Sequence, residues 1–274
     1  MVAIEIYDDP VNPHGWGVEP MVRRLRVECP DADWRVHPTT LVETWERYDG
    51  PEFPRGRQRV PATCSRVSEE TGMPIDEYLW FDDPPSTSRP ACAGIAAVTD
   101  PGSPARTRLV RAAREATMLH QTNLDSMAAV RELVATTLGP DRAAAVPATA
   151  DAGPVPDGDE LGDVPGVEWV GDRPRLPTVV ATAGADRRGV SGAVDVGALR
   201  ELVAAVTGET PTPRTDTVAA AIDRFSPAGW LCGAELVAVT GRPYQETLET
   251  ATALADVTTR EFAAEPFVRA TEHL

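Results

Sequence analysis

The first forty residues change from one hydrophobic pattern to another. Residues 2–7, Val-Ala-Ile-Glu-Ile-Tyr, place a β-branched side chain at every second position, which predicts a strand. A loop rich in Pro and Gly occupies 8–17, and residues 18–29 place their apolar side chains on one helical face. Residues 33–42 predict a second strand. The chain therefore opens as strand, loop, helix and strand.

The middle of the chain is expected to be helical from about residue 60 to residue 150. Apolar residues recur at helical spacing over 104–123, and a segment that begins with Asp and ends with Gly predicts another helix over 125–139. Strands are expected again at 176–183 and 187–194, where a Gly-Ala-Asp turn joins them as a hairpin.

A helix over 195–208 completes this part, so we expect residues 1–208 to form one α/β domain with a helical insertion. Residues 209–214 are a Pro- and Thr-rich linker. The remainder, 215–274, predicts three helices and a terminal β-hairpin, with a Gly-Arg-Pro corner suited to a helix-turn-helix. We therefore predict a C-terminal winged-helix-like α+β module.

The charge balance is strongly acidic. The formal net charge is -16, the sequence pI is about 4.7, and all 26 basic residues are Arg. Acidic surfaces of this kind keep proteins soluble in concentrated salt, which indicates a halophilic protein. The same charge makes nucleic-acid binding an unfavourable hypothesis, because phosphate contacts require clustered cations.

Other classes of protein are disfavoured by what the sequence lacks. No apolar run approaches the roughly 18 residues of a spanning helix, and the first ten residues do not resemble a signal peptide. We therefore expect a cytoplasmic protein without membrane contact. The four cysteines are far apart in the sequence and form no C-x-x-C or zinc pattern, so we expect no disulfide, metal or cofactor.

Four segments together resemble the DsbA family of thioredoxin-fold proteins, in particular its FrnE-like branch of dithiol-disulfide isomerases. They are DDPVNPHGWGVEPMVRRL (8–25), TGMPIDEYLWFDDPPSTSRPACAGIAAV (71–98), RLVRAAREATMLHQTN (108–123) and LPTVVATAGADRRGVSG (176–192). The resemblance covers about residues 2–207 and implies a thioredoxin-like fold with an inserted helical domain. It also places the family's cis-proline at Pro177.

The chain departs from this family at the active-site loop. The resemblance puts Asn12 and Gly15 where the family has its two catalytic cysteines, with Pro13 and His14 as the intervening pair. A carboxamide cannot attack a disulfide, because the exchange requires a thiolate. The family's redox activity is therefore not expected here, and no catalytic residue is assigned.

Three functions remain open from the sequence. The leading hypothesis is a peptide- or protein-binding module, an adaptor or chaperone, that holds a client in a groove beside Trp16, Leu176 and Pro177. An enzyme is the second, either a disulfide oxidoreductase that uses Cys64 or Cys92, or an acid/base catalyst that uses His14. Cys29 is disfavoured because it lies at the far end of the first helix, about 18 Å from Asn12 at 1.5 Å per helical residue.

The third hypothesis is a ligand-sensing transcription regulator that binds DNA through the C-terminal module. The charges oppose it, because residues 211–274 contain five Arg and nine acidic residues. The expected recognition helix carries Glu246 and Glu249, with Arg242 only at its start. A homodimer or a protein partner that binds through 215–274 is the better interpretation.

Overall fold

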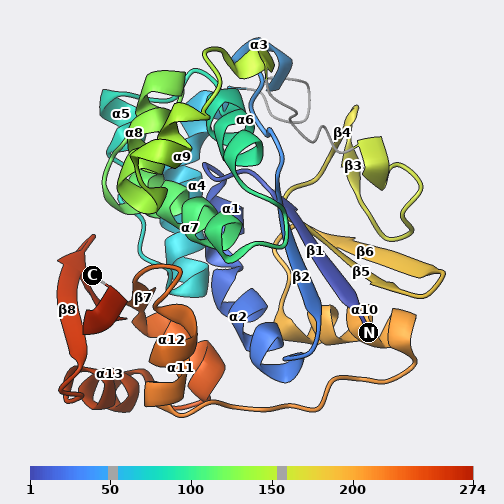
Figure 1. Ribbon diagram of the computed structural model, residues 1–274. Coiled ribbons are helices and arrows are strands. Elements are labelled where there is room, and N and C mark those ends of the chain that lie inside the picture. Colours follow the sequence, from blue (N-terminus) through green and yellow to red (C-terminus); the bar gives the residue numbers. More distant parts are fainter. Residues whose placement is uncertain (49–54, 153–158, 274) are drawn as a thin grey trace.

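The computed structural model describes residues 1–48, 55–152 and 159–273, and Figure 1 shows their arrangement. The strands are β1 (Ala3–Asp8), β2 (Asp33–Pro38), β3 (Trp169–Val170), β4 (Arg173–Pro174), β5 (Thr178–Ala183), β6 (Asp186–Ser191), β7 (Leu231–Cys232), β8 (Val257–Phe262) and β9 (Glu265–Ala270). The helices before β5 are α1 (Pro13–Gly17), α2 (Glu19–Glu28), α3 (Trp45–Tyr48), α4 (Gly56–Thr71), α5 (Leu79–Asp82), α6 (Arg89–Val98), α7 (Pro104–Leu119), α8 (Met127–Leu138) and α9 (Pro140–Ala144). Those after it are α10 (Val196–Thr207), α11 (Val218–Phe225), α12 (Gly233–Thr240) and α13 (Tyr244–Thr252). The short helices η1 (Ala150–Ala152), η2 (Asp159–Leu161) and η3 (Thr271–His273) complete the order.

The central sheet has the strand order β2-β1-β5-β6. β1 pairs with β2 in parallel and with β5 in antiparallel, and β5 forms the predicted hairpin with β6. The predicted second strand is shorter than expected. It ends at Pro38, which lies opposite Asp8, because β1 ends there and provides no further backbone to pair with.

One face of this sheet is covered by α2 and α10, whose apolar side chains pack with those of β1 and β5 in a common core. Helices α4 to α9 lie between β2 and β5 in the sequence. α6, α7, α8 and α9 share a second core, which contains Ile95, Leu109 and Val130. The helices expected at 104–123 and 125–139 are confirmed as α7 and α8, and Ser103 and Ser126 cap their N-termini.

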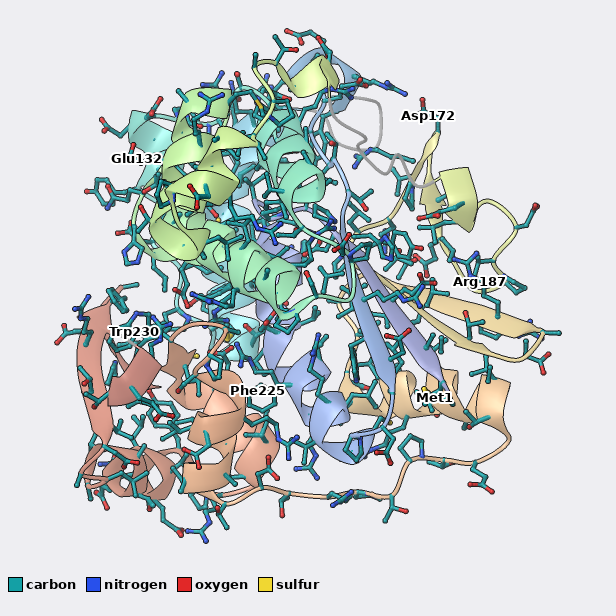
Figure 2. The ribbon with its side chains drawn as sticks, viewed as in Figure 1. Met1, Glu132, Asp172, Arg187, Phe225 and Trp230 are labelled. Carbon is teal, nitrogen blue, oxygen red and sulfur yellow. The ribbon has the colours of Figure 1, made fainter. Side chains whose placement is uncertain are left out.

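The C-terminal segment has the element order α11, β7, α12, α13, β8 and β9, with the strand order β7-β9-β8. Three helices and a terminal hairpin are present as expected, whereas β7 was not anticipated from its two residues. α12 packs against α2, and Val27 of α2 enters the apolar core of this segment. Phe225 and Trp230 lie where the segment meets the rest of the chain (Figure 2).

Within the described part of the chain, no helix combines the length and the apolar composition that a membrane crossing requires.

Candidate functional site

The loop that connects β1 to α2 is fixed by Asn12. The Asn12 Oδ1 atom accepts a hydrogen bond from the His14 backbone N–H at 3.1 Å, and its Nδ2 donates to Asp8 Oδ1 at 2.8 Å. Asn12 is therefore the N-cap of α1, with Pro13 at the first helical position, where a missing N–H costs nothing. The Asn12 side chain is 2% exposed and serves the loop's own structure.

Gly15 has no room for a side chain. A Cβ atom added to Gly15 would lie 1.6 Å from Oδ2 of Asp8, far inside any allowed contact. The Asp8 carboxylate cannot easily withdraw, because Arg114 Nη2 contacts Oδ2 at 2.5 Å. Burial raises the pKa of Asp8 to about 6, although Arg114 and Asn12 lower it. The Asp8 carboxyl group thus occupies the space that any side chain at position 15 would need.

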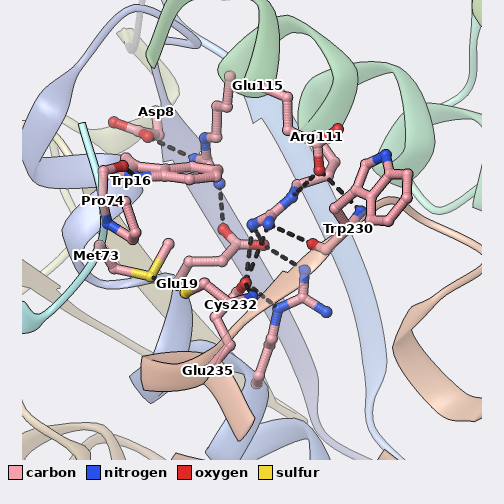
Figure 3. A network of polar contacts seen from close by, with 12 residues as sticks. Asp8, Trp16, Glu19, Met73, Pro74, Arg111, Glu115, Trp230, Cys232 and Glu235 are labelled. Carbon is pink, nitrogen blue, oxygen red and sulfur yellow. Dashed lines mark hydrogen bonds and ion pairs between the residues drawn. The ribbon is translucent and has the colours of Figure 1, made fainter. Parts of the chain in front are cut away.

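Asp8 lies at one end of a group of buried charges, which Figure 3 shows from close by. Arg114 pairs with Glu19 as well as with Asp8. Glu19 lies on α2 and also approaches Arg23 of the same helix, with 3.6 Å between Arg23 Nη2 and Glu19 Oε1. We call the set Asp8, Glu19, Arg23, Arg111, Arg114, Glu115 and Glu235 the buried ion network.

The other end of the buried ion network lies in the C-terminal segment. Glu235 Oε1 is 2.7 Å from Arg23 Nε and 2.8 Å from Arg111 Nη1. Arg111 also pairs with Glu115 at 2.8 Å and donates to the carbonyl oxygen of Trp230 at 2.5 Å. Because these residues come from α2, α7 and the β7–α12 region, the network joins the C-terminal segment to the sheet and helices that carry the loop.

Trp16 is buried and does not line a groove, contrary to its expected place on a peptide-contacting surface. Its side chain is 0% exposed, its Nε1 donates to the Pro74 carbonyl at 2.9 Å, and the Arg111 guanidinium lies 4.3 Å from the ring centroid. The aromatic ring is buried because α1 turns it inward against the helices. Trp16 therefore stabilises the loop from its buried side.

A cavity of about 700 Å³ lies on the other side of the loop. Its walls come from the loop, from the segment around α3, from α4, and from the residues that precede β5 and follow β6. The apolar and aromatic residues that line it include Val11, Leu41, Val42, Trp45, Val60, Trp80 and Leu176. A cavity of this size and character is suited to a ligand with apolar side chains.

The Leu176–Pro177 peptide bond is cis, as the resemblance implied. Leu176 lines the cavity, whereas Pro177 is buried beside it and accepts a hydrogen bond from the Gly192 N–H at 2.7 Å. Within the described residues, neither the N–H nor the C=O of Leu176 has a hydrogen-bonding partner. The backbone next to the cis bond therefore has two hydrogen-bonding groups that no described residue satisfies.

Sequence reasoning missed the cations of this cavity, which are Arg59, Arg66, Arg173 and Arg175. One signal was available. Arg59 and Arg66 are seven residues apart, which places them on the same face of α4 two turns apart. Nothing in the sequence indicated that this face and the segment before β5 line the same cavity, because that arrangement depends on how the helices pack.

The two cysteines proposed for the enzyme hypothesis are poorly placed for catalysis. Cys64 is buried, and burial raises the pKa of its thiol to about 12; burial also raises the pKa of Cys92 well above its ordinary value. A thiol with a raised pKa is a poor source of thiolate. His14 lines the cavity, where burial and then Arg66 lower its pKa. In the described residues, no cluster of His, Cys, Asp and Glu suited to a metal ion is found.

Comparisons with solved structures show which fold this is. The chain superposes on a protein assigned as a disulfide isomerase from Nitrosomonas europaea with a TM-score of 0.54, at 20% identity over 74% of this chain and 95% of that one. A DsbA-type oxidoreductase from Streptomyces coelicolor gives a TM-score of 0.54, at 14% identity over 79% and 94% of the two chains. The α/β structure is therefore of the DsbA-type thioredoxin fold.

Comparison with curated proteins gives one relative. The ClpXP adapter protein SpxH of Halalkalibacterium halodurans is 29% identical over 129 residues. These residues are 44% of this chain and 41% of the relative, so the chain spans less than half of the relative's length. No protein-family model matches the chain.

Proposed function

We propose that this protein is a DsbA/FrnE-like binding module whose thioredoxin-type domain holds an extended segment of a client protein without performing disulfide exchange. The observation that carries the proposal is the cavity of about 700 Å³ beside a loop that contains no cysteine. The resemblance puts Asn12 and Gly15 of this loop where the family has its two cysteines, so the cavity would bind a client without thiol chemistry.

The backbone at Leu176 supports a strand-addition mode of binding. Its unpaired N–H and C=O lie beside the cavity, and an extended peptide gains affinity by pairing with such groups. Side chains of the peptide would then pack against Trp45 and Trp80, which also line the cavity. These contacts require no reactive group, so the loss of both cysteines leaves them intact.

An adaptor role is consistent with the limited similarity to a ClpXP adapter protein. The C-terminal segment would provide a second interaction surface. Its order of three helices with a terminal hairpin is that of a winged helix, and we propose that it binds a protein or a second copy of this chain. DNA is a poor partner for α13, because Glu246 and Glu249 are exposed on it and Arg242 is paired with Glu246 at 3.2 Å.

A disulfide-reductase assay on a model protein substrate tests this proposal against the enzyme hypothesis. The native protein is compared, in potassium chloride with dithiothreitol as electron donor, with a variant in which all four cysteines are replaced by Ala. We expect background rates from both proteins, because the cysteines of the helical part are buried and their pKa values are raised. Turnover by the native protein that the variant lacks would establish the enzyme hypothesis instead.

A further inference from the structure

The cavity differs in charge from the rest of the molecule. The whole chain has a formal net charge of -16, with 42 acidic and 26 basic residues. Among the described residues that line the cavity, four are Arg and none is Asp or Glu. A positively charged recess in an acidic protein concentrates anions and repels cations. The charge of the cavity therefore selects among peptides that would fit its shape.

The arginines that line the cavity come from two different parts of the chain. Arg59 and Arg66 extend from one face of α4, and Arg175 directly precedes Leu176, whose backbone is available for pairing. An extended peptide that pairs with Leu176 would therefore lie in the same cavity as cations from both parts. Trp45 and Trp80 add aromatic surface to this cavity.

These arginines are only weakly engaged by the protein itself. Arg66 Nη1 is 3.5 Å from Glu70 Oε2, and the two side chains are 52% and 56% exposed. Arg175 Nη1 is 3.4 Å from Glu168 Oε2, with 51% and 61% exposed. Arg59 has no ion pair with a described residue. Exposed pairs of this length contribute about 0–1 kcal/mol, so a ligand carboxylate can replace the internal partner at little cost.

We propose that the occupant of the cavity is an extended acidic peptide, with carboxylates that pair with Arg59, Arg66 and Arg175 and apolar side chains that pack against Trp45 and Trp80. This inference rests on the proposed peptide-binding function and specifies the chemistry of the client segment. Guanidinium groups suit it, because they bind carboxylates through two parallel hydrogen bonds.

The test uses three rhodamine-labelled hexapeptides in which leucine alternates with glutamate, with glutamine or with lysine. Binding to the full-length protein is measured by fluorescence anisotropy in about 0.1 M and about 1 M potassium chloride, and circular dichroism confirms that the protein is folded in both. We expect the glutamate peptide to bind best. Its affinity should fall at the higher salt concentration, where charges are screened within about 3 Å.

Substitutions distinguish the contribution of the arginine charges to binding from the contribution of the cavity's shape. The double variant Arg59→Gln/Arg66→Gln should weaken binding of the glutamate peptide by about tenfold, and binding of the glutamine peptide by less than about twofold. Arg57→Gln is the matched control, because Arg57 is exposed on the same helix but does not line the cavity. It should leave both affinities unchanged.

The outcomes distinguish this inference from the proposed function. Equal binding of the glutamate and glutamine peptides, or an equal loss in the Arg57→Gln variant, would overturn the preference for acidic segments while peptide binding itself stood. If none of the three peptides bound, the proposed function would fail together with the inference. Displacement of the peptide by an equimolar amount of free glutamate would show that the site takes a small carboxylate and not a peptide.

Discussion

The arginines of the buried ion network and those of the cavity are the same kind of side chain in opposite surroundings. Arg111 is 2% exposed and is bound by Glu235, Glu115 and the Trp230 carbonyl. Arg66 is 52% exposed and has one long contact with Glu70. An arginine that is enclosed and paired joins parts of the fold, whereas one that is exposed and loosely paired remains available to a ligand.

Removing a charge is expected to have different consequences in the buried ion network and at the cavity. In the buried network each cation depends on an acid that water cannot replace, so the loss of one partner leaves an uncompensated charge. At the cavity, water solvates a charged side chain that has no ion-pair partner in the protein. Substitutions in the network should therefore affect folding, and substitutions in the cavity should affect binding.

The largest effect is expected from Glu235→Gln. Glu235 pairs with both Arg23 and Arg111 and accepts a hydrogen bond from the Cys232 N–H at 3.0 Å. Its neutralisation should lower the free energy of unfolding by about 3–5 kcal/mol. Chemical denaturation monitored by circular dichroism measures this value.

Glu246→Gln is the matched control for that substitution. Glu246 pairs with Arg242 on the exposed side of α13, where the two side chains are 55% and 44% exposed. The change should alter the free energy of unfolding by less than about 0.5 kcal/mol. If Glu235→Gln cost no more than this, the network would not hold the C-terminal segment in place.

The next largest effect is expected from Gly15→Ala, which tests the space beside the network. The added Cβ would overlap Oδ2 of Asp8, which Arg114 holds, so we expect a loss of about 1–3 kcal/mol in the free energy of unfolding. Gly102→Ala is the control, because the atoms nearest to its Cβ are 3.7 Å away. Thermal unfolding of both variants decides the point, and equal stability would mean that Asp8 can move aside.

A smaller effect concerns Asp9, a buried acid outside the network. Asp9 accepts hydrogen bonds from the Val11 and Leu41 N–H groups and from the Ser88 hydroxyl. Burial raises the pKa of Asp9 to about 7, against an ordinary value of 3.8. Because the folded state then holds this proton more tightly than the unfolded state, the contribution of Asp9 to the free energy of unfolding falls as the pH rises from about 4 to about 7.

Denaturation of the native protein and of Asp9→Asn across this pH range measures the contribution. The free energy of unfolding of the native protein should fall more steeply with pH than that of Asp9→Asn. The difference in slope is at most about 1.4 kcal/mol per pH unit, the value for one proton. Asp8 titrates in the same interval but is present in both proteins, so the difference between the curves isolates Asp9. Parallel curves would show that Asp9 is ionised throughout.

The smallest effect on stability is expected from the cavity itself. Arg59→Gln/Arg66→Gln should change the free energy of unfolding by less than about 0.5 kcal/mol, because both side chains are exposed. Chemical denaturation under the conditions of the binding assay gives this value. A loss comparable to that of Glu235→Gln would mean that the cavity arginines support the fold.

Much of the fold could be predicted from local patterns. The alternation over residues 2–7 and the helical spacing over 104–123 correspond to β1 and α7. Such elements can be predicted because the apolar residues that pack into a core recur with the period of the strand or helix. β7 escaped prediction because two residues carry no period. The end of β2 at Pro38 also escaped, because it depends on where the neighbouring strand stops.

The candidate site was predictable only in part. Asn12 and Gly15 could be placed in the loop, and Leu176 beside a cis-proline, from the order of the motifs. Trp16 was misplaced, because the sequence does not show which way a short helix turns its side chains. The cavity arginines were missed, because charged residues on one face of a helix usually meet only solvent.

By itself, the sequence determined that the loop has no cysteine, that the chain is strongly acidic, and where the longer strands and helices form. Side-chain chemistry and local periodicity are properties of single residues and their near neighbours. Only the tertiary structure decided that Asp8 fills the space beside Gly15 and that Glu235 meets Arg111, 124 residues away in the sequence. Only it decided that Arg59 and Arg175 line one cavity. These relations depend on long-range packing, in which exclusion of water and close contact act between residues that no local pattern connects.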